Sequence, residues 1–232
     1  MKIYIDRPKV NARATLANVM SVGGLLLLLA SVVAPLFLPS LAGISLLLLA
    51  AGGIIAMVGI YYSNRWIRKP RPEDSLDKAL KAFDDNYRLY HYPKLPCDHV
   101  LLTPSGIVVM EVVNLAGSFS YRNGRWKEAM TIGRALRYIV EPRVIDPVVA
   151  AQTLQDDMKN WLGDQPKLKT SIPIKVLTVF THPATELEVQ RSPFPACTIG
   201  KLRKQAATQG PKLAHETYER LGSALERFTV ES

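Results

Sequence analysis

The chain has 232 residues, 48% of them hydrophobic, and a net charge of +9. Residues 1–72 hold eight basic residues and one acidic residue, so residues 73–232, with 21 basic and 19 acidic residues, have a net charge of only +2. This distribution argues against a basic nucleic-acid footprint spread over the whole chain. The spacing of the two cysteines fits neither a zinc site nor a disulfide framework.

The N-terminal part of the chain predicts a membrane anchor. Residues 1–15 are short, polar and basic, and no charged residue occurs between residues 14 and 64. A PLFLPS break divides the apolar stretch, residues 16–63, into two segments, about 16–37 and 41–62, each long enough to cross a bilayer. Basic residues flank the pair and the connecting loop has no charge. The positive-inside rule therefore predicts a protein of the cell membrane, with both termini and the soluble domain in the cytoplasm.

Residues 64–72 predict a basic linker that two prolines stiffen, and residues 73–232 form the predicted soluble domain. The domain begins with a helix over residues 73–83, whose apolar positions recur at helical spacing. Glu73 lies at the edge of that apolar stripe. Two interpretations remain open: Glu73 points into the domain, or it is a first-turn carboxylate that the helix dipole favours.

The stretch that organises the domain is a predicted β-hairpin over residues 98–117. An apolar strand at 100–102 and a second at 107–113 are joined by Thr103-Pro104-Ser105-Gly106, which has turn chemistry. Glu111 interrupts the second strand, and a carboxylate in an apolar strand is costly unless it has a partner or binds a metal. An antiparallel hairpin would bring Asp98 close to Glu111.

Further elements follow from local patterns. We predict strands at 87–92, 172–180 and 196–199, and a hairpin that turns at Asn123-Gly124. A helix begins at Asp146-Pro147, with Asp146 as its N-cap, and its predicted buried stripe is Ala150, Leu154, Met158 and Trp161. Two further helices are predicted at 201–207 and 212–228. Basic residues of the last two helices either contact phosphates or form a solvated surface; they are Lys201, Arg203, Lys204 and Lys212. We interpret His91 and His99 as hydrogen-bonded structural residues, and Cys97 as a small buried residue.

One set of residues resembles the NERD (nuclease-related) family of the PD-(D/E)xK superfamily. The set is Asp98-His99, Gly106, Met110-Glu111-Val112, Asn114 and Gly117. The resemblance runs from about residue 73 to the C-terminus. It implies an α/β fold, with a restriction-endonuclease-like core whose mixed central β-sheet is flanked by helices, here preceded by a transmembrane helical hairpin. It also implies that Glu73, Asp98 and Glu111 are the catalytic and metal-binding residues, for Mg²⁺ or Mn²⁺.

The sequence departs from the family pattern at two places. Val113 stands where the family has a lysine that helps to activate water, and Ala150 stands where a glutamine is expected. Lys94, Lys127 or Lys81 could supply the missing cation. We therefore expect a degenerate domain that binds nucleic acid or a protein partner with little or no hydrolysis. An active Mg²⁺-dependent nuclease and a purely structural membrane-tethered module are the alternatives, so whether the protein is an enzyme stays open.

Overall fold

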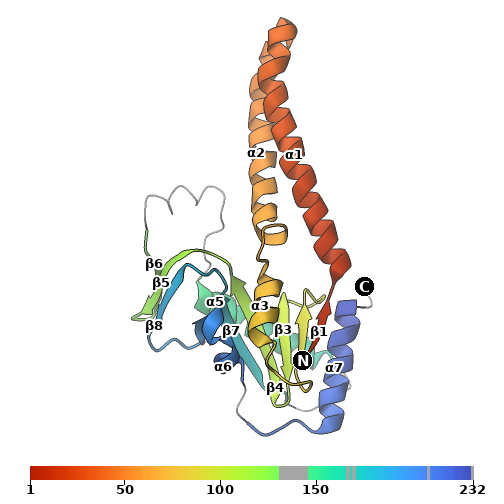
Figure 1. Ribbon diagram of the computed structural model, residues 1–232, viewed down its shortest axis with the longest axis vertical. Coiled ribbons are helices and arrows are strands. Elements are labelled where there is room, and N and C mark those ends of the chain that lie inside the picture. The colour runs from red at the N-terminus through yellow and green to blue at the C-terminus, as the bar shows by residue number, and fades with distance from the viewer. Residues whose placement is uncertain (131–145, 166–167, 169–170, 208–209, 231–232) are drawn as a thin grey trace. The chain divides into compact units, whose positions relative to one another are not determined.

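The computed structural model describes residues 1–130, 146–165, 168, 171–207 and 210–230 (Figure 1). The chain divides into two compact units. One unit is α/β and contains residues 1–6, residues 72–129 and the described residues from 146 onwards. The other contains residues 7–71 and is helical. Each unit is described by itself below.

The helical unit is a pair of long helices, α1 (Arg7–Phe37) and α2 (Ala42–Trp66), joined by a short 3-10 turn, Pro39–Leu41. Both helices are long and apolar enough to cross a membrane, and most of their large apolar side chains are exposed. Glycines allow the two helices to approach closely: a Cβ on Gly24 would collide with the α2 backbone, and one on Gly59 with the α1 backbone. The predicted helical hairpin is therefore present, and α1 begins before the predicted span.

A six-stranded mixed sheet forms the centre of the α/β unit, in the order β1-β2-β3-β4-β7-β9 (Figure 1). The strands are β1 (Lys2–Ile5), β2 (Arg88–His91), β3 (His99–Thr103), β4 (Gly106–Val113), β7 (Ile174–Phe180) and β9 (Ala196–Thr198). The β2-β3-β4 pairs are antiparallel, and the β1-β2, β4-β7 and β7-β9 pairs are parallel. The expected α/β fold with a mixed central sheet is thus confirmed.

The edge strand β1 was not predicted, because the sequence around it indicates only a short, polar and basic segment. It pairs with β2 from Lys2 opposite Arg88 to Ile5 opposite His91. The ring of Tyr4 stacks on Tyr90, with centroids 4.9 Å apart. The N-terminal strand therefore belongs to the α/β unit, although two long apolar helices separate it from that unit in the sequence.

A smaller three-stranded sheet has the order β6-β5-β8, with β5 at Gly117–Arg122, β6 at Arg125–Glu128 and β8 at Thr185–Val189. The predicted hairpin at Asn123-Gly124 is confirmed. Both turn residues have positive φ, 52° and 77°, as a type I′ turn requires. Strand β8 was not predicted.

Helices cover both faces of the large sheet. The first face carries α3 (Pro72–Leu80) and α6 (Leu202–Ala206), which follows a 3-10 turn at Ile199–Lys201. The second face carries α5 (Pro147–Gly163) and α7 (His215–Val230). Asp146 caps α5 as predicted, but the buried stripe differs from the prediction: Ala151 and Leu162 are buried with Met158, while Leu154 and Trp161 are only partly buried.

Candidate functional site

The β3-β4 hairpin fixes where the two predicted strand acids lie. Its turn closes when the Thr103 hydroxyl donates to the Gly106 carbonyl at 2.9 Å, and Gly106 has a φ of +146° that disfavours a side chain. From this turn the register runs to His99 opposite Met110. Continuing the ladder by one residue sets Asp98 opposite Glu111.

Backbone contacts place both acids in one row across the end of the sheet. The Tyr92 amide donates to the Asp98 carbonyl at 2.6 Å, and Glu111 pairs with Thr178 of β7. Both carboxylate residues are half-buried, so water reaches them. Two acids on adjacent strands repel each other, and one proton or one divalent cation relieves the repulsion.

Glu73 reaches the same end of the sheet from helix α3. It is 2% exposed, and its Oε2 atom accepts a hydrogen bond of 2.7 Å from the Tyr92 hydroxyl. Glu73 thus points into the domain and also lies in the first turn of α3, so both interpretations fit its position and its role in an acidic site stays a prediction. Tyr92 has a φ of 57°, a conformation that is costly for a bulky residue. Tyr92 thus connects two of the predicted site acids, by its side chain to Glu73 and by its amide to Asp98.

The alternation of β4 places Glu111 on a particular face of the sheet. Its neighbours Met110 and Val112 pack in the cluster that contains Leu76 of α3. The Glu111 side chain therefore projects from the sheet face opposite α3, the helix that carries Glu73. Within the described residues, no group of three or more His, Cys, Asp or Glu side chains is placed to hold a metal ion. The set of Glu73, Asp98 and Glu111 as metal ligands stays a prediction.

The position of the missing lysine is apolar. Val113 packs against the cluster of Leu115, Phe119 and Phe180, where β4 meets the smaller sheet. Its carbonyl accepts a hydrogen bond from the Thr181 amide at 3.0 Å. Valine suits this half-buried strand position.

The three lysines proposed as substitutes lie in different places. Lys81 follows α3 directly, Lys94 precedes β3, and Lys127 lies on β6 of the smaller sheet, opposite Ser120. All three are exposed. Their role as replacement cations stays a prediction.

A buried hydrogen-bonded chain lies beside Glu73. The Nδ1 atoms of His91 and His99 are 2.8 Å apart, and His91 Nε2 is 2.9 Å from Asp77 Oδ1. Both histidines are at most 2% exposed, so the interpretation of them as hydrogen-bonded structural residues is confirmed. Sequence reasoning missed Asp77, although it follows Glu73 by one helical turn and therefore lies on the same face of α3.

The comparison with protein families gives one match. Residues 71–181 match the family model described as nuclease-related domain, NERD. The chain contains a nuclease-related domain. The match to NERD runs from the start of α3 to the end of β7, so it includes Glu73, Asp98, Glu111 and Val113. The strands β1 and β9 and the helices α6 and α7 lie outside the matched NERD residues. No curated protein and no solved structure matches the chain.

Proposed function

We propose that this protein is a membrane-anchored NERD domain that binds nucleic acid through a degenerate PD-(D/E)xK domain, with little or no hydrolysis. The observation that carries the proposal is Val113, which occupies the lysine position and packs in an apolar cluster. A phosphodiester transition state gathers negative charge, and a positioned cation must meet that charge. Losing one such group typically costs about 10²–10³ in rate.

Asp98 and Glu111 are the residues that would hold Mg²⁺ or Mn²⁺. They fit such an ion, because Mg²⁺ usually takes one or two carboxylates and keeps several waters. A bound ion would supply positive charge at a phosphate oxygen. Glu73, buried against Tyr92 on the α3 side, is a third candidate ligand, and the expected binding is weak.

Calorimetry of the full chain in detergent micelles tests the metal site. We expect weak Mn²⁺ binding in the wild type, which Glu111→Ala removes. Glu216→Ala is the matched control, because Glu216 is an exposed glutamate of α7. Equal Mn²⁺ binding by the wild type and Glu111→Ala would exclude a site at Glu111.

A nuclease assay tests the role of residue 113. We expect little or no cleavage of DNA or RNA by the wild type with Mg²⁺, and some cleavage by Val113→Lys if the acids converge. Robust cleavage by the wild type that Glu111→Ala abolishes would contradict the degenerate site. It would instead indicate an active nuclease with a displaced lysine, Lys94 first and Lys127 second.

The anchor is proposed to be a hairpin of α1 and α2 that crosses the cell membrane twice. Strand β1 precedes α1 and pairs with β2, so the N-terminal strand and the NERD domain must lie on the same side of the membrane. The basic flanks of both helices favour the cytoplasm. In intact cells we expect an impermeant thiol reagent to label Ser40→Cys and to leave Lys2→Cys unlabelled; labelling of Lys2→Cys would exclude this topology.

A further inference from the structure

Four exposed basic residues are concentrated in a short part of the chain outside the NERD match. Residues 201–212 contain Lys201, Arg203, Lys204 and Lys212 and no acidic residue. All four are exposed, and none forms an ion pair with a residue that the structure describes. Because residues 73–232 have a net charge of only +2, this segment is a local concentration of positive charge. We call these four residues and Lys175 the α6 surface.

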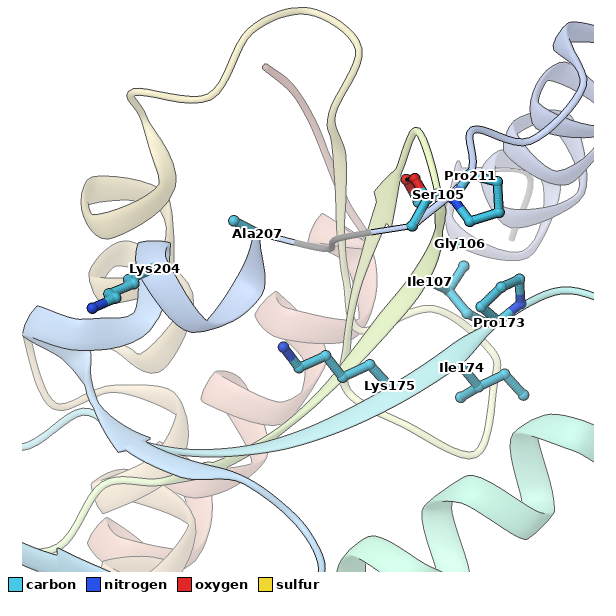
Figure 2. A pocket seen from close by; sticks show the side chains of 10 residues that line it. Ser105, Gly106, Ile107, Pro173, Ile174, Lys175, Lys204, Ala207 and Pro211 are labelled. Atoms are coloured by element: carbon cyan, nitrogen blue, oxygen red, sulfur yellow. Dashed lines mark hydrogen bonds between the residues drawn. The ribbon is translucent and has the colours of Figure 1, made fainter.

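A hollow of about 480 Å³, lined in part by Lys175 and Lys204 of the α6 surface, lies between α6, the first residues of β7 and the β3-β4 turn (Figure 2). Ala207, Gly210 and Pro211 also line it. Ser105 Oγ donates to the Gly210 carbonyl at 3.3 Å, and the Leu213 amide donates to the Pro104 carbonyl at 2.8 Å. These two bonds hold the segment next to Lys212 against the turn.

Lys175 brings a partly buried positive charge to the hollow. It is half-buried on β7, and its Nζ donates to the Gln205 carbonyl of α6. Figure 2 shows its ammonium group between α6 and the turn, and Lys204 of α6 also lines the hollow. Of the five basic residues, only Lys175 and Lys204 line the hollow, so the positive charges of the α6 surface extend beyond it.

Cations distributed over a surface are better suited to bind a chain of phosphates than to bind one anion. No aromatic side chain lines the hollow, so the surface has nothing on which a base could stack. Lysine and arginine contacts to phosphates give affinity that is independent of sequence and dependent on salt. We propose that the α6 surface binds the sugar-phosphate backbone of nucleic acid, with one phosphate in the hollow beside Lys175 and Ser105.

This inference rests on the proposed nucleic-acid binding and adds the surface that carries it. Lys175 pairs with Val108, whose side chain belongs to the α3 and α6 face of the sheet. Glu111 leaves the sheet on the opposite face. Nucleic acid on the α6 surface would therefore be held away from Asp98 and Glu111, which agrees with binding that does not lead to cleavage.

Fluorescence anisotropy of the full chain in neutral detergent micelles tests the inference, with a labelled DNA duplex of mixed sequence titrated over a salt series. With about four phosphates neutralised, the slope of log affinity against log salt is about −4. The Lys201→Gln/Lys204→Gln double variant should flatten the slope by about 2 and weaken binding about tenfold at low salt. Lys78→Gln/Arg125→Gln, which removes the same charge from exposed positions elsewhere, should keep the wild-type slope.

Each other outcome overturns the inference in a distinguishable way. No duplex binding by the wild type would refute both the proposed function and the α6 surface. Wild-type binding that both double variants weaken equally would show a general charge effect and refute the surface alone. Binding that Glu111→Ala abolishes and the α6 variant leaves intact would place the nucleic acid at the carboxylates. Binding of soluble short-chain phosphatidylserine that depends on Lys201 and Lys204, without duplex binding, would assign the surface to anionic lipid.

Discussion

Replacing Arg88 should lower the free energy of unfolding more than replacing an arginine that forms only an exposed ion pair. Arg88 lies on β2, and its side chain is 10% exposed. Its Nη2 donates to both carboxylate oxygens of Glu219 on α7, at 2.6 and 2.8 Å, and its Nη1 donates to Glu226 at 3.1 Å. The guanidinium carbon also lies 5.0 Å from the centre of the Tyr218 ring. This group of contacts attaches α7 to the sheet.

The cost of Arg88→Met follows from these contacts. The two glutamates are 45% and 34% exposed, so water screens each ion pair and limits it to about 1 kcal/mol. The contact with Tyr218 adds about 0.5–1 kcal/mol. We expect a loss of about 2–3 kcal/mol in the free energy of unfolding, which lowers the melting temperature of a unit of this size by about 5–10 °C.

Thermal unfolding of the full chain in detergent, followed by tryptophan fluorescence, measures this loss. Arg220→Met is the control, because the Arg220–Glu216 pair lies within α7 and is 52% and 74% exposed. It should cost less than about 0.5 kcal/mol. Equal melting temperatures for the two variants would refute the reasoning, because α7 would then be held by its apolar face alone.

The same contact predicts a dependence on pH. The hydrogen bond from Arg88 holds the pKa of Glu219 below its usual range. A group whose pKa is lowered by folding stabilises the folded state above its unfolded pKa, and that stabilisation disappears as the pH falls through the folded pKa. The difference in stability between the wild type and Arg88→Met should therefore be constant near neutral pH and shrink below about pH 4.

Three further predictions concern other parts of the chain. Tyr92→Phe should lower the free energy of unfolding by about 1–3 kcal/mol in chemical denaturation, because it removes a buried hydrogen bond to the Glu73 carboxylate. Gly24→Leu should lower the melting temperature of the helical circular dichroism signal, whereas Gly23→Leu should not, because a Cβ at Gly23 meets nothing within 4 Å. Burial raises the pKa of the Cys197 thiol to about 12, so iodoacetamide at pH 8 should alkylate it in the unfolded chain and leave it intact in the folded protein.

The elements that sequence could predict are those fixed by local chemistry. The turn at 103–106, the type I′ turn at Asn123-Gly124 and the N-cap of α5 each depend on a few adjacent residues. Strand β8 also had a signal in the sequence, because Glu186 and Glu188 alternate with Thr185, Leu187 and Val189. Strand β1 carried none, since it is an edge strand of four residues whose partner lies beyond two long helices.

The candidate site could be predicted only in part, because only part of it is determined by adjacent residues. Hairpin register follows from the turn, so the approach of Asp98 and Glu111 could be inferred from sequence. The contact between Tyr92 and Glu73 could not, because it depends on a positive φ at the end of β2 that no local pattern indicates. The sheet face on which each acid lies could not be predicted from the sequence either, since it depends on which helix covers which side of the sheet.

These contacts change how the three acids bear on activity. Glu73 has a structural explanation that needs no metal, since it is buried and accepts a hydrogen bond from Tyr92. Its presence therefore does not argue for catalysis. Asp98 and Glu111 are half-buried, lie in one row and share a face with Val113. We therefore expect any cleavage of nucleic acid to depend on that one face, where Glu111→Ala and Val113→Lys change residues two positions apart on β4.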